Sequence, residues 1–289
     1  MSSRNRRYRG RDDLVRWWWI QSAPSVQCPM SALLPPRSPR DHHPGAKPGT
    51  YDLTPGWLMA LRTKLRRLQH RRSAKMPDYE TRTINGQAVR HVVSLGTHCM
   101  ASLILRNAGL KRYSLPFDWI HATPGMVRHV LETDFSDFLP PEGQERHATF
   151  HDRFGLRHIF VHRDIASAQG RAYYGRCITR FRKLMSARDG KLFVMISRPA
   201  NPIAWHFPDL VDLLGRLTPN AELLAIQLQP PRDGHSMSIE LANERHGSRL
   251  YDFRPASDES ALGYFPDVVD ELMILRLIYQ YHLDLAETP

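Results

Sequence analysis

The chain has 289 residues, enough for one large domain or for one domain with an extension. Its formal net charge is +11, yet residues 1–82 contain 17 Lys/Arg against 6 Asp/Glu, whereas residues 83–289 contain 23 of each. Because the whole excess of positive charge lies at the N-terminus, the folded part has no basic bias, and we do not expect it to bind nucleic acid.

The cysteines are three in number and widely spaced: Cys28, Cys99 and Cys177. This pattern predicts neither a disulfide framework nor a metal-ligand pair, so we expect a cytoplasmic protein without a metal or other cofactor. No apolar run reaches the about 18 residues that a membrane span needs. The Arg-rich start and the short run Trp17–Ile20 resemble a signal peptide only weakly, and export is not expected.

The N-terminal part is expected to be an extension. Residues 1–53 are rich in Arg, Pro and Ser, a composition that predicts disorder, with a cationic arm for anionic membranes or RNA as the alternative. Residues 54–82 predict a basic amphipathic helix and a linker, with Thr54 as the cap and Pro55 in the first turn. We expect the helix to pack on the domain; a weak contact with a membrane surface through residues 57–72 is the alternative.

Residues 83–289 are predicted to form a single α/β domain, because apolar runs of strand length alternate with helical periodicity. Strands are expected at 92–95, 157–162, 191–197, 221–227 and 248–253, and helices at 98–108, 123–133, 170–188, 208–217 and 266–281. This alternation with short links predicts a three-layer fold with a mostly parallel sheet and helices on both faces.

Cys99 lies where the first predicted strand passes into the first predicted helix, with Gly96 and Thr97 in the turn. At a helix N-terminus, unbonded N–H groups and the helix dipole favour the thiolate, which is the nucleophilic form of a cysteine. Parallel sheets also place ligands beyond the carboxyl ends of their strands. The pattern therefore predicts a thiol nucleophile, and a buried packing cysteine is the alternative.

Two motifs carry a family resemblance: Ser-Leu-Gly-x-x-Cys at residues 94–99, and Ser-x-Pro-Phe-Asp-Trp-Ile at residues 114–120. Separated by a helix, they resemble a bacterial family of unknown function described as papain-like cysteine peptidases. The resemblance covers residues 90–200 and continues weakly to about residue 275. It implies a Cys/His site that hydrolyses or transfers acyl groups of a peptide, ester or glycan-linked substrate. Papain-like folds pair a helical lobe with an antiparallel sheet, whereas this element order predicts a parallel one, so we apply the resemblance to the site and not to the fold.

A thiol nucleophile needs a proton acceptor, and His162 is the first candidate. It ends a predicted strand, and the resemblance places a histidine there, followed by acidic or polar residues. Asp164 or Asp118 would orient its ring. His151 is the competing base. Neighbouring side chains on a first helical turn point in different directions, so we do not expect direct proton transfer from Cys99 to His98, but a protonated His98 would lower the pKa of the thiol.

The substrate-binding groups are expected on the turn itself, where side chains and backbone N–H groups can donate to an oxyanion. These residues are Ser94, Gly96, Thr97 and His98. Asp118 also has a purely structural interpretation, because a buried carboxylate can tie down a loop through backbone N–H groups. Asn201 and Asp252 follow predicted strands and are alternative third members of a triad. Cys177 lies inside a predicted helix and is interpreted as a packing residue.

Two functions other than thiol-dependent catalysis are compatible with the sequence. The first is a sugar- or nucleotide-related transferase, or another ligand-binding α/β protein, in which Cys99 is structural. The second is a non-enzymatic interaction module that acts through the basic N-terminal helix. The sequence contains no phosphate-binding loop, dinucleotide fingerprint or nucleophile elbow that would favour the transferase.

Overall fold

The computed structural model describes residues 81–289 except 145, 232–236 and 260–262. The predicted extension at 1–53 and all but the last two residues of the segment 54–82 therefore lie outside the described residues. Arg82 already pairs with Tyr281, so the domain includes the residue before the predicted start at 83. In the part of the chain that is described, no helix is long and apolar enough to cross a membrane.

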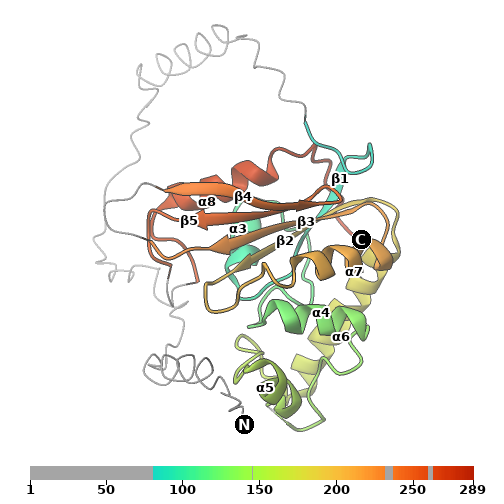
Figure 1. The fold of residues 1–289 in the computed structure, drawn as a ribbon. Helices are drawn as coiled ribbons and strands as arrows, with labels where there is room; N and C mark the ends of the chain where they lie inside the picture. Colours follow the sequence, from blue (N-terminus) through green and yellow to red (C-terminus); the bar gives the residue numbers. More distant parts are fainter. Residues whose placement is uncertain (1–80, 145, 232–236, 260–262) are drawn as a thin grey trace, which may run out of the picture. The chain divides into compact units, whose positions relative to one another are not determined.

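A five-stranded sheet forms the centre of the described domain (Figure 1). Its strands are β1 (Val89–Ser94), β2 (Gly190–Ser197), β3 (Ala221–Leu228), β4 (Ser238–Arg245) and β5 (Ser248–Arg254). They lie in the order β1-β2-β3-β5-β4, and all neighbouring pairs are parallel except β4 and β5. The predicted mostly parallel sheet is confirmed.

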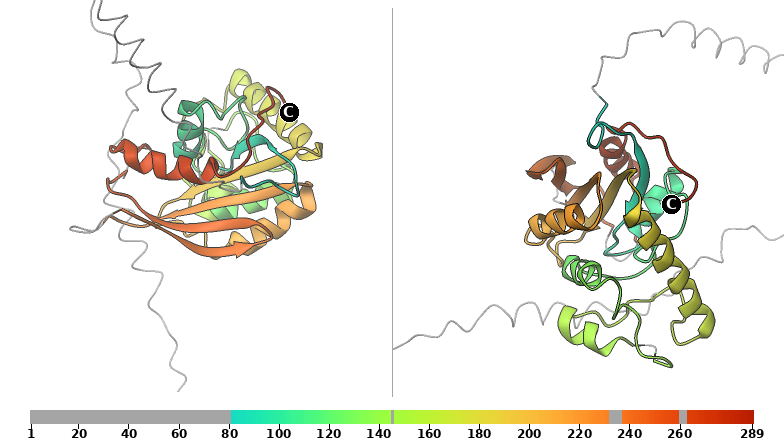
Figure 2. Two further views of the ribbon diagram at one scale, coloured as in Figure 1. Left: turned by 90° about the horizontal axis from the view of Figure 1, so that it is seen from above. Right: turned by 90° about the vertical axis from the view of Figure 1, so that its right-hand side faces the viewer.

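Helices cover both faces of this sheet, as Figure 2 shows from two further directions. One face carries α3 (Met100–Asn107) and α8 (Val268–Ile278). The other face carries α4 (Pro124–Glu132), α6 (Ala168–Ser186) and α7 (Phe207–Leu217). The short helix α5 (Ala148–Phe154) packs against α4. Because side chains alternate along a strand, β2 supplies both cores. Leu192, Val194 and Ile196 pack towards α3 and α8, and Phe193 and Met195 pack towards α4, α6 and α7. The three-layer prediction is confirmed.

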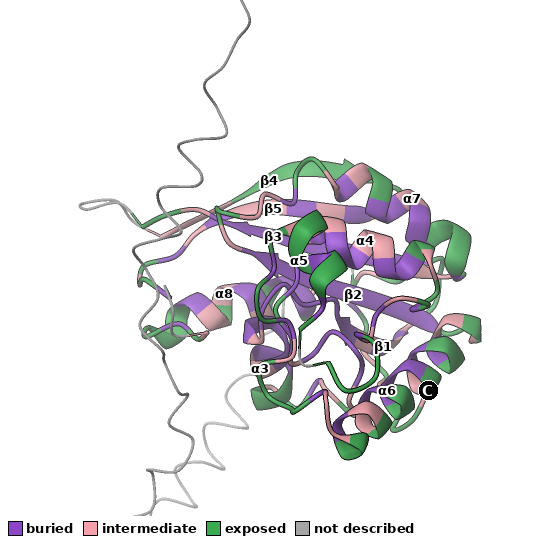
Figure 3. Cartoon of the chain, turned by 90° about the horizontal axis from the view of Figure 1, so that it is seen from below, coloured by how far each residue is buried: buried purple, intermediate pink, exposed green. Residues whose placement is uncertain are grey.

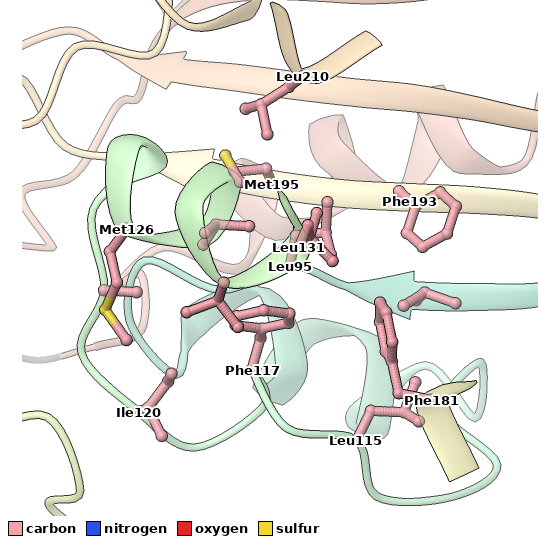
Figure 4. Close-up of a cluster of buried hydrophobic side chains, with 14 of the residues drawn as sticks. Leu95, Leu115, Phe117, Ile120, Met126, Leu131, Phe181, Phe193, Met195 and Leu210 are labelled. Atoms are coloured by element: carbon pink, nitrogen blue, oxygen red, sulfur yellow. The ribbon is translucent and has the colours of Figure 1, made fainter. Parts of the chain in front are cut away.

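Burial follows this layering. Figure 3 shows β2 buried along its length and β4 largely exposed at the edge. The close-up in Figure 4 shows Phe117 beside the sheet in the same cluster as Phe181, Phe193 and Leu95. The ring centroids of Phe117 and Phe181 lie 5.9 Å apart, edge to face. The Pro-Phe-Asp-Trp-Ile segment is therefore anchored in the core next to the end of β1.

One predicted strand is absent from the structure, and two elements of the structure were not predicted. The predicted strand at 157–162 is wrong: the segment forms turns, and the backbone N–H of His121 donates to the carbonyl of Ile159 at 2.9 Å where a ladder was expected. The apolar residues that suggested a strand are anchored in the core instead: Ile159 is buried, and the half-buried Phe160 packs against Phe138 and Tyr174. Helix α5 and strand β4 were not predicted. The mostly exposed sequence of β4 lacks the alternation of apolar and polar residues that is typical of a strand. The sequence feature that indicates a hairpin is the turn at His246 and Gly247, where both φ angles are positive.

Candidate active site

The turn after β1 places Cys99 at the start of α3. Gly96 has a φ of +64°, and a Cβ built on it would lie 2.6 Å from the carbonyl oxygen of Phe117. The hydroxyl of Ser94 accepts a hydrogen bond from the Gly96 N–H at 3.2 Å. Cys99 is the N-cap residue of α3, so the predicted strand–turn–helix arrangement is confirmed.

Replacing Gly96 with alanine is expected to lower the free energy of unfolding by about 2–3 kcal/mol, because an alanine at positive φ is strained and its Cβ would contact a backbone oxygen. Urea unfolding followed by circular dichroism measures the loss. The matched control is Gly175→Ala in α6, where a Cβ meets nothing within 4 Å and helix propensity favours alanine. Equal effects of the two substitutions would contradict this account of the turn.

Cys99 itself is half-buried and close to the loop after β5. Its Sγ lies 3.4 Å from the position that a Cβ at Gly263 would occupy. The first turn of α3 carries no acidic residue, so no carboxylate there offsets the positive end of the helix dipole. Cys177, by contrast, is fully buried in α6, and burial raises the pKa of its thiol, as expected for a packing residue.

His98 is almost completely buried, with 4% of its surface exposed. Its Nδ1 lies 3.0 Å from the hydroxyl of Thr97, whereas its Nε2 has no hydrogen-bond partner among the described residues. Burial, together with the positive charge of Arg198, lowers the pKa of His98 well below its ordinary value, so the imidazole is neutral at neutral pH. Nε2 shares its lack of a partner with four other buried side-chain atoms of the described residues: Arg82 Nε, His91 Nε2, Tyr174 OH and Thr218 Oγ1.

The loops after β2 and β5 are joined beside His98. Arg198 follows β2 directly and forms a two-pronged ion pair with Glu259, with N–O distances of 2.8 and 2.7 Å. The Glu259 side chain is 8% exposed and the Arg198 side chain 31%, so the carboxylate is shielded from water while the guanidinium reaches it. Neither residue was predicted from the sequence. Asn201 was selected because ligands bind beyond the carboxyl ends of parallel strands, and the same reason applies to Arg198.

A second histidine, His121, lies in the same region and was also missed. The backbone N–H of the adjacent Ala122 donates to the carbonyl of Thr97 at 2.8 Å, which holds this segment against the turn. Although His121 is solvent-exposed as a residue, the chain around its ring and the charge of Arg198 lower its pKa. His121 is therefore neutral at neutral pH and able to accept a proton.

His162, the predicted base, lies on the exposed loop before α6. Its ring packs edge-on against Trp119 with 6.0 Å between centroids, and burial lowers its pKa. It acts electrostatically on His121, and His121 in turn acts on His98. His98 directly precedes Cys99, and the segment that carries the unpredicted His121 is hydrogen-bonded to Thr97 in the same turn, whereas the ring contact of His162 is with Trp119. His151 lies in α5, where its ring nitrogen pairs with Asp152 at 3.0 Å.

The two predicted orienting carboxylates make local contacts. Asp118 is 1% exposed and accepts hydrogen bonds from Leu115 N–H at 2.6 Å and Ser102 Oγ at 2.9 Å, and it forms an ion pair with Lys111. Asp164 accepts from the N–H of Ala166 at 2.9 Å just before α6. These contacts favour the loop-tying interpretation of Asp118 and give Asp164 a comparable role.

The remaining strand-end candidates also have contacts of their own. Asp252 accepts a hydrogen bond from Gln229 at 3.0 Å, and the carbonyl of Asn201 accepts one from the hydroxyl of Ser197. Within the described ranges, no group of three or more His, Cys, Asp or Glu side chains is arranged to hold a metal ion.

The turn after β1 thus carries a half-buried thiol at a helix start, preceded by a buried, neutral imidazole. Residues 90–224 match the model of the family DUF1796, described as putative papain-like cysteine peptidase. No curated protein and no solved structure gives a significant match to the chain. The DUF1796 match runs from β1 into β3 and includes Cys99, the three histidines His98, His121 and His162, and Arg198, whereas Glu259 and Gly263 lie beyond its end.

Proposed function

We propose that this protein is a thiol-dependent acyl hydrolase or transferase in which Cys99 is the nucleophile. The observation that carries the proposal is the position of Cys99 at the N-terminus of α3, directly after β1 and the buried His98. The match to DUF1796 supports the same chemistry. The proposed substrate is a peptide, an ester or a glycan-linked acyl group, and a thiol nucleophile suits the reducing cytoplasm.

In the proposed reaction, the Cys99 thiolate attacks the carbonyl carbon of the substrate, and the carbonyl electrons move onto the oxygen. Backbone N–H groups at the start of α3 stabilise that oxyanion. The collapse of this intermediate expels the amine or alcohol, which takes up the proton that the thiol lost, and leaves a thioester on Cys99. Water then hydrolyses the thioester, or an acceptor nucleophile takes the acyl group.

His121 ranks ahead of His162 as the proton acceptor. The segment that carries His121 is hydrogen-bonded to the turn before Cys99, whereas His162 lies on a loop whose nearest ring contact is Trp119. His162 is kept as the second candidate. The proposal assigns no catalytic step to Asp118 or Asp164, because the hydrogen bonds of both carboxylates are local.

The alkylation rate of Cys99 by iodoacetamide tests this proposal. We expect Cys99 in the folded full chain to react fast, with an apparent pKa below about 8.5, the value of an ordinary thiol. Peptide mass spectrometry after labelling from about pH 4 to about pH 9 gives the profile of each cysteine. If Cys99 stays inert until the protein unfolds, it is a core residue, and the ligand-binding alternative with a structural cysteine gains support.

The base is identified by comparing His121→Asn with His162→Asn. With His121 as the acceptor, His121→Asn should slow alkylation of Cys99 near neutral pH by at least about tenfold, and His162→Asn should leave the rate unchanged. The reverse result would assign the role to His162. Thermal unfolding of both variants controls for lost structure.

A further inference from the structure

Trp205 has the largest exposed fraction, 82%, of any large apolar side chain among the described residues. It lies in the loop between β2 and α7, two residues before the helix begins. The backbone beside it is fixed: the N–H of Ile203 donates to Gln227 Oε1 at 2.8 Å, and the N–H of His206 donates to the carbonyl of Ile203 at 2.8 Å. The loop therefore presents an exposed indole on an ordered backbone, which lowers the entropy cost of a contact made by this ring.

An apolar hollow lies at the opposite end of α7. It opens near the C-terminal ends of α4, α6 and α7, and its apolar walls are Leu131, Phe135, Phe181, Met185 and Leu217. Its volume is about 280 Å³. Because an apolar cavity of about 150 Å³ already holds a benzene ring, this hollow has room for the larger ring system of a tryptophan.

The polar side of the apolar hollow is held in place by Arg182. Its Nε donates to Asp134 Oδ1 at 3.0 Å, and its Nη2 donates to the carbonyl of Asp134 at 2.7 Å. Asp134 and Phe135 both have positive φ angles, an uncommon conformation for residues other than glycine, and the Phe135 side chain is buried. A guanidinium attracts the face of an indole, so Arg182 suits a tryptophan as the occupant of the hollow.

The side chains at the two ends of α7 carry opposite charges. Asp209 lies in its first turn, close in sequence to Trp205, and Arg216 lies in its last turn, next to Leu217 of the apolar hollow. The Asp209 side chain is 59% exposed although it pairs with Arg128, so it remains accessible to a second cation. When the start of one α7 meets the end of another, the charges around the two features are therefore complementary.

We propose that the protein self-associates head to tail, with Trp205 of one copy inserted into the apolar hollow of the next. A second copy is the occupant because the exposed ring and the hollow match in size and chemistry, and the charges that flank them are opposite. A symmetric contact between two Trp205 side chains would instead set Asp209 against Asp209. Since the two contact surfaces differ, the contact repeats and builds rings or open chains. The inference is independent of the chemistry proposed for Cys99.

Sedimentation velocity of the full chain tests the association. We expect the mean sedimentation coefficient of the wild-type chain to rise between about 1 and about 100 μM, a range that covers contacts of moderate affinity. Trp205→Ser removes the indole and Leu217→Arg places a charged side chain in the apolar hollow, so each variant should stay monomeric. The matched controls Tyr279→Ser and Leu241→Arg change exposed residues at the end of α8 and in β4, and they should associate like the wild type. A wild-type chain that stays monomeric over this range overturns the proposal.

Mixing the two variants tests the geometry of the contact. Trp205→Ser keeps the apolar hollow and Leu217→Arg keeps the indole, so a mixture can form a single contact that does not propagate. We expect the equimolar mixture to form a dimer of one copy of each variant, with no longer species. A mixture that stays monomeric, or a Trp205→Ser chain that still associates, overturns the head-to-tail contact. Melting curves confirm beforehand that each variant is folded.

Discussion

Cys99→Ala is expected to abolish acylation of the protein while leaving its fold intact. With p-nitrophenyl acetate, an activated ester that needs no specific recognition, the wild-type chain should release p-nitrophenol in a burst of about one equivalent as the thiol is acylated. In the variant the burst should disappear, and the initial rate should fall by at least about a thousandfold, the scale seen when a nucleophile is removed. Cys99 is half-buried and caps α3 without a side-chain cap hydrogen bond to the helix, so alanine should cost little stability.

The matched control is Cys177→Ala. Cys177 is fully buried in α6, and its pKa is raised by burial, so it should contribute nothing to the burst. A modest loss of stability is expected from the cavity it leaves. A burst that survives in Cys99→Ala, or one that disappears in a folded Cys177→Ala, would refute the assignment of Cys99 as the nucleophile.

The layers of the fold could be predicted because their signals are local. The apolar run of β2 is typical of a strand covered on both faces, and its odd and even residues do pack into separate cores. The segment 157–162 also contains a short apolar run, but no neighbouring strand pairs with it, and pairing depends on residues far away in the sequence. Strand β4 was missed for the opposite reason. Its mostly exposed sequence gives no strand signal of its own, and the strand forms because it pairs with β5.

The candidate site was only half predictable for the same reason. The position of Cys99 follows from consecutive residues, and the strand–turn–helix pattern was sufficient to find it. Arg198 and Glu259 are 61 residues apart and meet only because the loops after β2 and β5 share one edge of the sheet. His121 becomes relevant through a backbone contact of its neighbour with Thr97, which no sequence pattern encodes.

Asp118 shows how one buried charge changes an interpretation. From the sequence it could orient a histidine or tie a loop; the structure surrounds it with Lys111, Ser102 and the N–H of Leu115. Lys111→Met leaves the carboxylate buried without its counter-charge. We expect a loss of about 3–5 kcal/mol in the free energy of unfolding, equivalent to about 6–20 °C in melting temperature. Calorimetry or urea unfolding measures it.

The pH dependence of that loss identifies its cause. Burial raises the pKa of Asp118, and Lys111 opposes the rise, so removing Lys111 should raise the pKa in the folded state further. A raised folded pKa contributes stability below the unfolded value, and this contribution is lost as the pH rises through the folded value. The deficit of Lys111→Met relative to wild type should therefore be smallest in acid and grow towards neutral pH.

The control is Arg112→Met, which removes the neighbouring but exposed ion pair with Glu287 at 3.2 Å. Because both partners are in contact with water, the change should cost less than about 1 kcal/mol. It should also lack the pH dependence, since neither charge is buried. A Lys111→Met deficit that is the same in acid and at neutral pH would mean that packing of the lysine stem, and not its charge, holds the loop beneath Cys99 in place.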